Sequence, residues 1–234
     1  MKYIDLAEIL KKNIENGLYH EDGKLPTEDK LMAEYNVTRY CVRNAINILI
    51  ELGFIYPVQG SGIFVRGSKR EGCLTLIETK GLQGEFGKEN VKTKVISLKI
   101  VEADEKLTEK FKCKNGTPIY EVVRLRIVKG DLFAVEYAYY NKDIIYYLNN
   151  EIAEDSIYSY IKNDLKLNFA FADKIISCEK LDKEASTLLN LKVGEPALII
   201  EDECYLSNGD IFNVSRVVYN YKYAKLFSLV KCNN

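Results

Sequence analysis

The sequence contains no tryptophan, one histidine and six widely separated cysteines. No two cysteines lie within four residues of each other, so the closely spaced Cys pairs of structural zinc sites are missing. We expect the reduced thiols of a cytosolic protein and no disulfide framework. His20 stands beside Glu21, Asp22 and Gly23 and is interpreted as a solvated loop residue, not as a member of a catalytic triad. Neither a metal nor a cofactor is expected.

Long hydrophobic runs and an excess of one charge are also missing. No apolar run approaches the roughly 18 residues of a membrane span, and residues 1–5 lack the hydrophobic region of a signal peptide. We therefore expect a cytoplasmic protein with no membrane partner. The 33 Lys and Arg residues nearly balance the 34 Asp and Glu residues. This balance excludes non-specific coating of nucleic acid by bulk charge but allows a local basic patch.

The charge is nevertheless distributed unevenly along the 234 residues. Residues 1–37 contain 5 basic and 8 acidic residues, whereas residues 38–70 contain 5 basic residues and a single acidic one, Glu51. A short basic segment of this kind suits a phosphate-backbone partner, but it is equally typical of a helix with a solvated basic face. Charge alone leaves both interpretations open.

The first 66 residues show the pattern of three helices followed by a two-stranded hairpin. Apolar residues at helical spacing predict helices over about 6–14, after Thr27, and from Thr38 to about 52, with both threonines as N-caps. Strand-like segments at 54–58 and 63–65 follow. This order is typical of a winged helix-turn-helix, whose third helix enters the DNA major groove with its N-terminal end.

Two groups of residues in this unit are suited to DNA. Arg39 and Arg43 are four residues apart, near the N-terminal end of the third helix and on its exposed side, and arginine binds guanine edges or phosphate. At the hairpin tip, glycines allow a close approach to DNA, where Gln59 or Ser61 can donate hydrogen bonds.

Residues 3–66 resemble the DNA-binding domain of GntR-family bacterial transcription regulators. Four segments at fixed spacings carry the resemblance: KLPTEDKL at 24–31, YNVTRYCVRNA at 35–45, LGFI at 52–55 and QGSGIFV at 59–65. The resemblance implies that operator DNA is contacted by Thr38, Arg39, Tyr40, Arg43, Gln59, Gly60 and Ser61. Where the family commonly has an arginine, this chain has Asp29. A carboxylate repels phosphate, which puts one usual DNA contact in question, unless Lys30 replaces it.

The rest of the chain repeats one pattern. A strand near 96, a helix over 104–111 and a hairpin that starts after Gly116 are matched by a strand near 176, a helix over 182–189 and a hairpin after Gly194. Two such halves, joined by a helix at about 155–165, predict one antiparallel sheet with helices on a face, an α+β fold. We place the domains at 1–66 and 83–234, with a linker at 67–82 that becomes a strand near 73–77.

Three charged residues of the first half share one face of this sheet. Arg124 and Arg126 are two residues apart on a strand, and a hairpin centred on Gly130 places Arg124 opposite Glu136. They can form an exposed ion pair worth a fraction of a kcal/mol. Alternatively, they line a pocket in which the guanidinium groups bind an anion and the carboxylate binds hydroxyl or amine groups. The spacing by itself favours the exposed pair.

Residues from about 85 to 230 are similar to a UTRA domain, the effector-sensing module of HutC-type GntR regulators, whose fold is similar to chorismate lyase. The shared segments are VEAD at 101–104, GTPIY at 116–120, RLR at 124–126, SIY at 156–158, GEP at 194–196 and SRVVY at 215–219. The resemblance implies an effector pocket lined by Arg124, Arg126, Glu136, Ser156, Tyr158 and Tyr219. It also implies Asn213 at the place of a further pocket carboxylate, and Thr79 and Lys80 in a loop that meets an effector phosphate.

The sequence thus predicts a DNA-binding transcription regulator, a repressor that reads a palindromic operator as a homodimer. A small anionic metabolite such as a sugar phosphate is expected to control its operator affinity. Two alternatives remain open: a small-molecule lyase, which would not need the N-terminal unit, and a DNA-binding protein whose C-terminal domain only dimerises. Tyr137, Tyr139 and Tyr140 are expected either at the dimer surface or in the core.

Overall fold

The computed structural model describes residues 1–19, 23–66, 72–76 and 81–228. The chain divides into two compact units: Met1–Glu71 with Ser228–Asn234, and Gly72–Phe227. The boundary between Glu71 and Gly72 falls inside the segment expected to be a linker. No helix of the described residues has both the length and the apolar character needed to cross a membrane.

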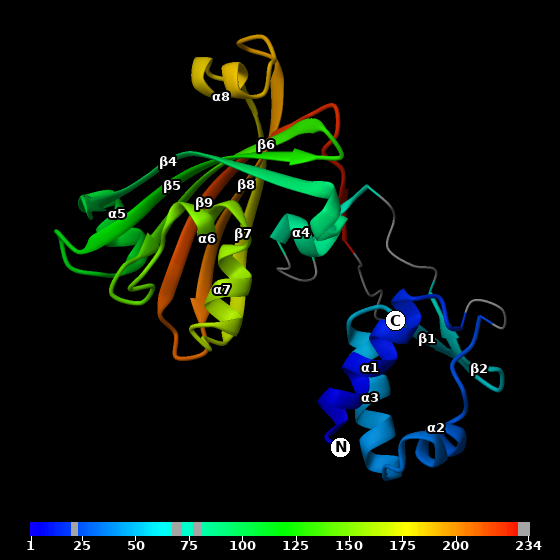
Figure 1. Cartoon of the computed structure of the whole chain (residues 1–234). Coiled ribbons are helices and arrows are strands. Elements are labelled where there is room, and N and C mark those ends of the chain that lie inside the picture. The colour runs from blue at the N-terminus through cyan, green and yellow to red at the C-terminus, as the bar shows by residue number, and fades with distance from the viewer. Residues whose placement is uncertain (20–22, 67–71, 77–80, 229–234) are drawn as a thin grey trace. The chain divides into compact units, whose positions relative to one another are not determined.

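The first unit has three helices and a hairpin, as the sequence predicts (Figure 1). Its elements are α1 (Tyr3–Glu15), α2 (Glu28–Tyr35), α3 (Arg39–Glu51), β1 (Ile55–Val58) and β2 (Gly62–Val65). The predicted caps are confirmed, because the Thr27 hydroxyl accepts a hydrogen bond from the Lys30 N–H at 3.4 Å and the Thr38 hydroxyl accepts one from the Cys41 N–H at 3.3 Å. Apolar faces of all three helices and β1 form one core.

The second unit is built on a six-stranded antiparallel sheet. Its strands are β4 (Val91–Glu102), β5 (Pro118–Val128), β6 (Asp131–Asn141), β7 (Phe169–Lys180), β8 (Pro196–Leu206) and β9 (Ile211–Asn220). The strand order β4-β5-β6-β9-β8-β7 sets the two halves of the repeat side by side, with β6 and β9 at the seam. The predicted repeat and the single antiparallel sheet are therefore confirmed.

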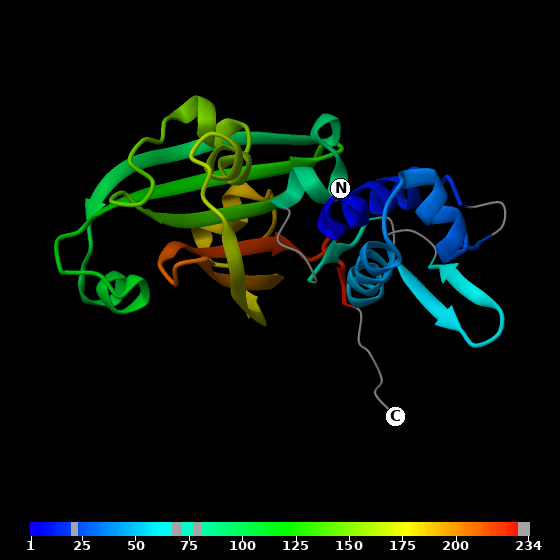
Figure 2. The ribbon, with the colours of Figure 1, turned by 90° about the horizontal axis from the view of Figure 1, so that it is seen from below.

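Helices cover both faces of this sheet. They are α4 (Gly81–Phe86), α5 (Glu105–Phe111), α6 (Asn150–Glu154), α7 (Ile157–Asn163) and α8 (Lys183–Leu188), with a short 3-10 turn, η1, at Lys88–Asn90. Ile157 and Ile161 of α7 pack with Val122, whereas Ala185 of α8 packs with Leu125. Because neighbouring strand residues alternate in direction, α7 and α8 lie on opposite faces. Figure 2 shows α6 and α7 over one face and α5 beyond the other.

A short parallel strand pair begins and ends the second unit. β3 (Leu74–Thr75) pairs with β10 (Leu226–Phe227), which confirms the strand predicted near 73–77. The second part of the expected linker thus contains β3 and the start of α4, both in the second unit. β3 is the first element after the boundary, so it is joined directly to the segment that leads to the first unit.

The structure tests what the sequence predicts for the cysteines and for three tyrosines of β6. The described cysteines at 41, 73, 113, 178 and 204 are free thiols, and His20 and Cys232 lie outside the described residues. Tyr140 is fully buried in the core on the α7 side of the sheet. Tyr137 and Tyr139 are partly buried on the other face, where they pack against the clusters around α8 and α5.

We expect Leu49→Ala to lower the free energy of unfolding of the first unit by about 2–5 kcal/mol, because Leu49 is fully buried in the core and the change leaves a cavity. Asn47→Ala, at an exposed position of the same helix, should change it by less than about 0.5 kcal/mol. Urea denaturation followed by circular dichroism measures both. Similar losses in the two variants would contradict this packing.

Candidate functional site

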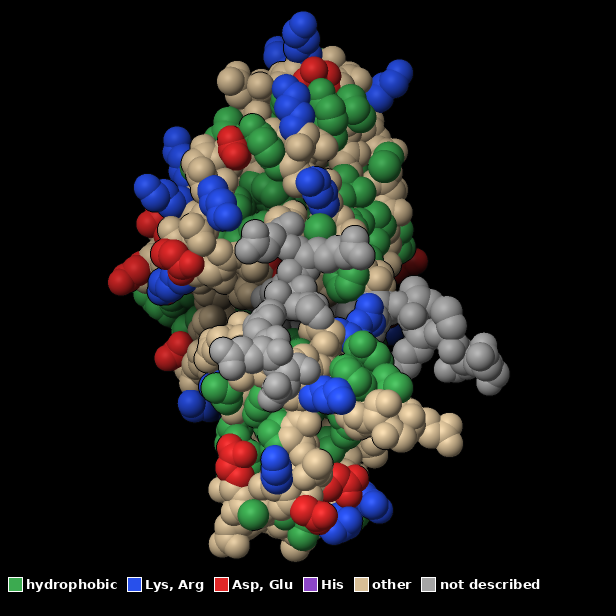
Figure 3. All heavy atoms as spheres, turned by 90° about the vertical axis from the view of Figure 1, so that its right-hand side faces the viewer, with side chains coloured by type: hydrophobic (Ala, Val, Ile, Leu, Met, Phe, Trp, Pro, Cys, Tyr) green, Lys and Arg blue, Asp and Glu red, His purple; other side chains and the backbone are tan. Residues whose placement is uncertain are grey.

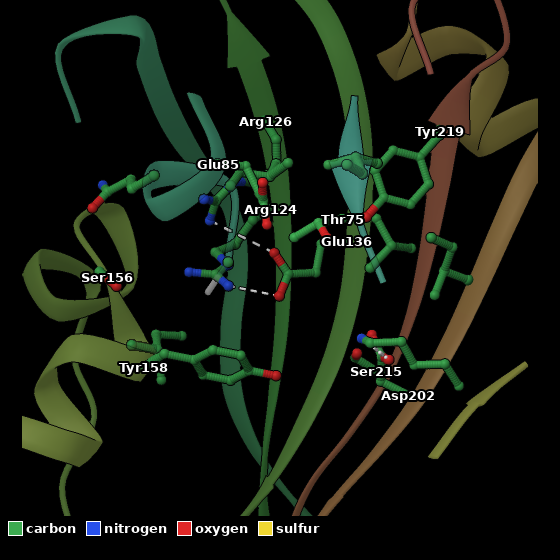
Figure 4. Close-up of a pocket in the computed structure, with 18 of the residues that line it drawn as sticks. Thr75, Glu85, Arg124, Arg126, Glu136, Ser156, Tyr158, Asp202, Ser215 and Tyr219 are labelled. Atoms are coloured by element: carbon green, nitrogen blue, oxygen red, sulfur yellow. Dashed lines mark hydrogen bonds and ion pairs between the residues drawn. The ribbon is translucent and has the colours of Figure 1, made fainter. Parts of the chain in front are cut away.

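A cavity of about 120 Å³ opens on the α7 side of the sheet (Figure 4). This is roughly ten times the space that one water molecule requires, so the cavity has room for a small metabolite. The cavity lies at the seam between the repeats, and β3, α4 and α7 complete its wall. Six residues named from the sequence line it: Arg124, Arg126, Glu136, Ser156, Tyr158 and Tyr219.

The Arg124–Glu136 pair is buried, not exposed. The two residues are register partners on β5 and β6, as predicted. Arg124 Nη2 donates a hydrogen bond to Glu136 Oε1 at 2.6 Å, and Arg124 Nη1 donates to the carbonyl oxygen of Ala153 at 3.0 Å. The side chains are 6% and 15% exposed. The interpretation as an exposed cross-strand ion pair is therefore wrong.

Arg126 has fewer polar contacts than Arg124. Its Nη1 lies 3.6 Å from Glu136 Oε2, and it makes no hydrogen bond to any residue that the structure describes. Its Nε is buried without a partner, although the side chain is only 6% exposed. Arg124, Arg126 and Glu136 therefore form a buried triad in which two cations share one anion. An anionic ligand would supply the missing hydrogen-bond acceptors.

The pKa shifts in the triad agree with this geometry. Burial alone would raise the pKa of Glu136, but the charges of Arg124 and Arg126 and the hydrogen bond from Arg124 outweigh it and hold the pKa below its usual value. Burial and the neighbouring charge of Arg124 lower the pKa of Arg126 to about 10. Both arginines therefore stay protonated at neutral pH, and the triad carries a net positive charge.

The α7 side of the cavity is positioned by caps and a buried tyrosine. The Ser156 hydroxyl caps α7 by accepting a hydrogen bond from the Ser159 N–H at 3.2 Å. Tyr158 donates a hydrogen bond to Asn213 Oδ1 at 3.0 Å. Asn213, in turn, donates to the carbonyl oxygen of Tyr139 at 3.0 Å. Asn213 is therefore placed behind Tyr158 and is not among the residues that line the cavity. Thr79 and Lys80 lie outside the described residues.

Lys174, Asp202 and Ser215 also line the cavity, and the sequence reasoning missed them. The internal repeat contained the signal. Aligning Gly116 with Gly194 puts Asp202 at the position of Arg124, so the second half also places a charged side chain on this face.

Within the described residues, no group of three or more His, Cys, Asp or Glu side chains is placed to hold a metal ion.

In the first unit, carboxylates of α2 bind the two arginines at the start of α3. Arg39 Nη2 donates to Asp29 Oδ1 at 2.5 Å, and Arg39 Nη1 lies 3.6 Å from Glu28 Oε2. Arg43 Nε donates to Glu28 at 3.1 Å. The four charges cancel, so this surface is less basic than the sequence of residues 38–70 suggests. On the face shown in Figure 3, basic and acidic side chains are likewise interspersed.

The other residues named for DNA lie around these arginines and on the hairpin. Tyr40 is 72% exposed, whereas the Thr38 hydroxyl is used as the cap of α3. Gln59, Gly60 and Ser61 form the exposed tip between β1 and β2. Gly60 has φ of 74°, a conformation that favours glycine and makes the tight turn.

Two segments of the chain match known families. Residues 2–65 match the family described as bacterial regulatory proteins, gntR family, and residues 87–225 match the UTRA domain. The chain belongs to the GntR family, with a UTRA domain. GntR-family regulators bind operator DNA and UTRA domains bind small-molecule effectors, so this protein is a DNA-binding transcription regulator with an effector domain.

The GntR-family assignment extends over almost the whole chain. The uncharacterized HTH-type transcriptional regulator YydK of Bacillus subtilis (strain 168) is 35% identical over 222 residues, 95% of this chain and 94% of that protein. The crystal structure of YydK covers 100% of both chains with 34% identity and a TM-score of 0.83. Thus the fold is that of a GntR regulator throughout.

Two further relatives are described as regulators. HTH-type transcriptional regulator GmuR of Bacillus subtilis (strain 168) is 29% identical over 92% of both chains. The mannosyl-D-glycerate transport/metabolism system repressor MngR of Escherichia coli (strain K12) is 25% identical over 93% of this chain and 91% of that protein. These similarities favour a regulator over the lyase alternative.

We expect Glu136→Gln to destabilise the second unit by about 3–5 kcal/mol at neutral pH, because it leaves two buried guanidinium groups without their anion. Folding lowers the pKa of Glu136. Its contribution to the free energy of unfolding is therefore complete above the ordinary glutamate pKa of about 4.3, and it is lost as the pH falls through the lower pKa of the folded state. The difference in free energy of unfolding between wild type and Glu136→Gln, which we call the stability gap, should therefore become smaller at acid pH.

Thermal denaturation of wild type and Glu136→Gln over a pH series measures this stability gap. Glu121→Gln on the neighbouring strand β5 serves as the control, because it opens the partly exposed ion pair with Lys99 but keeps an oxygen that can accept the hydrogen bond from Tyr139, and it should cost less than about 1 kcal/mol. Equal effects of the two substitutions at neutral pH would show that the triad does not stabilise the sheet.

Proposed function

We propose that this GntR regulator is a cytoplasmic, homodimeric repressor that leaves its operator when a small anionic metabolite, such as a sugar phosphate, occupies the cavity. The observation that carries the effector class is Arg126, a buried guanidinium group that lines the cavity without a hydrogen bond to any described residue. Burying such a charge costs free energy unless an anion pairs with it. A domain that only dimerises would have no use for this arrangement.

The dimer and the repressor role have separate support. A helix-turn-helix protein reads two half-sites as a symmetric dimer. The printed name of the relative MngR calls it a repressor of a mannosyl-D-glycerate system. By that similarity, we infer repression here and an effector that combines hydroxyl groups with an anionic group.

On the DNA side, we infer that Thr38, Arg39, Tyr40 and Arg43 face the major groove and that Gln59, Gly60 and Ser61 contact the DNA backbone. Arg39 and Arg43 support this, because both are exposed at the first two turns of α3. Each guanidinium group has five N–H donors, so an arginine bound to a carboxylate still has donors for a base. Asp29 and Glu28 then favour base contacts over phosphate contacts.

Part of the cavity wall lies close in the sequence to the boundary between the two units. Leu74, Thr75 and Leu76 line the cavity, and they follow the boundary between the units by only a few residues. A ligand alters DNA affinity only if it binds two arrangements of the protein differently. We infer that a ligand against β3 changes the path of the chain that leads to the DNA-binding unit.

We expect Arg39→Ala and Arg43→Ala each to weaken binding to the selected operator by about 1–3 kcal/mol, because each removes a base contact. Asp29→Asn should instead strengthen binding to random-sequence duplexes at low salt, and this gain should disappear at high salt. Fluorescence anisotropy with duplexes selected from a random pool measures both effects. The control Glu8→Gln removes the same charge from an exposed position of α1 and should have little effect. Wild-type operator affinity in both arginine variants would show that α3 is not the reader.

We expect a saturating effector to lower operator affinity by about 1–3 kcal/mol of coupling free energy. The effector is first found by thermal-shift screening of sugar phosphates, sugar acids, amino acids and organic acids, since a bound ligand raises the melting temperature. Arg126→Ala should bind the operator normally but no longer respond. If the operator affinity of the wild type is the same with and without a bound effector, the proposed control of DNA binding is wrong.

A further inference from the structure

The cavity contains a second ion pair that the anion-binding triad does not involve. Lys174 on β7 and Asp202 on β8 are register partners, and Lys174 Nζ donates a hydrogen bond to Asp202 Oδ1. Their side chains are 20% and 12% exposed, and both line the cavity. In Figure 4, Asp202 and Ser215 lie across the cavity from Arg124 and Arg126.

This ion pair retains unused hydrogen-bonding capacity. An ammonium group has three donors and a carboxylate has two oxygens, and the contact between Lys174 and Asp202 uses one donor and one oxygen. Ser215 on β9 is the register partner of Asp202 and also lines the cavity. A donor, an acceptor and a hydroxyl group that does both therefore stand side by side on three adjacent strands.

The triad and the Lys174–Asp202 pair differ in net charge. The triad of Arg124, Arg126 and Glu136 has a net positive charge, whereas Lys174 and Asp202 together are neutral. A neutral pair offers no net attraction to a second anion, but it matches a hydroxyl group, which accepts a hydrogen bond from an ammonium group and donates one to a carboxylate. Burial raises the pKa of Asp202 above its usual value although Lys174 acts in the opposite direction, so this carboxylate gains from a further hydrogen-bond donor.

We propose that Lys174, Asp202 and Ser215 form a second subsite that binds neighbouring hydroxyl groups of the effector. This proposal rests on the proposed function, because it takes the anionic group to be held at Arg124 and Arg126. The effector is then a polyhydroxylated anion that spans the seam between the two repeats, with its anionic group on the first half and its hydroxyl groups on the second. Anions without hydroxyl groups would fill only one end.

Isothermal titration calorimetry on the full-length protein tests the subsite. The probes are aldohexose 6-phosphates and sugar acids as polyhydroxylated anions, with inorganic phosphate and hexyl phosphate as anions that lack the hydroxyl groups. Wild type should bind at least one polyhydroxylated anion tenfold or more tightly than either simple phosphate, because a site that hydrogen-bonds hydroxyl groups rejects analogues without them. Equal affinity for hexyl phosphate and the sugar phosphates would overturn the proposal.

Variants then assign the selectivity to residues. Asp202→Asn and Lys174→Met should weaken binding of the polyhydroxylated anion tenfold or more and leave inorganic phosphate within about twofold. Ser215→Ala leaves the ion pair intact, so it should fold normally even if the other variants do not, and should cause a smaller loss of the same kind. The control is Glu179→Gln, which removes a carboxylate that pairs with Arg216 outside the cavity and should alter neither affinity.

The results separate the two proposals. If Asp202→Asn, Lys174→Met and Ser215→Ala all bind the polyhydroxylated anion like wild type, while Arg126→Ala does not bind it, the subsite is wrong and the anion site stands. If Arg126→Ala binds both kinds of anion like wild type, or if no anion binds wild type, the proposed function fails and the subsite fails with it.

Discussion

Two buried guanidinium groups share one carboxylate at the middle of the sheet, and the chemistry of the effector domain depends on this unequal sharing. Arg124 donates hydrogen bonds to Glu136 and to a backbone carbonyl oxygen, whereas Arg126 has, among the described residues, only an ion pair with Glu136 at 3.6 Å. In water the difference would matter little, because solvent would complete the hydrogen bonds of Arg126. Beneath α4 and α7 it matters, since a buried charge without partners is costly.

The internal repeat brings this triad and a second charged pair into one cavity. Because β6 and β9 are adjacent at the seam, residues of both halves project from the same face within the span of a small molecule. The two halves differ in their charged residues: the first has two arginines for one glutamate, and the second has one lysine for one aspartate. Duplication of a strand–helix–hairpin pattern therefore gives one cavity with two chemically different ends.

In the DNA-binding unit, arginines are also paired with carboxylates, but these ion pairs are exposed. Arg39 and Arg43 are paired with Asp29 and Glu28, so their attraction to phosphate is reduced while their remaining N–H groups stay available. Exposed ion pairs of this kind are individually weak. The triad, by contrast, is almost completely buried. The effector domain thus has buried charges, whereas those of the DNA-binding unit are largely exposed.

The sequence by itself determined the winged helix, its two threonine caps, the repeat and the pairing of Arg124 with Glu136, because local spacing and turn position fix all of these. It did not determine that this pair is buried, that Asn213 lies behind Tyr158, or that Lys174 and Asp202 face the same cavity. Those facts depend on which helix covers which face and on which strands meet at the seam. Only the tertiary structure decided them, because burial and the meeting of distant strands are properties of long-range packing and not of neighbouring residues.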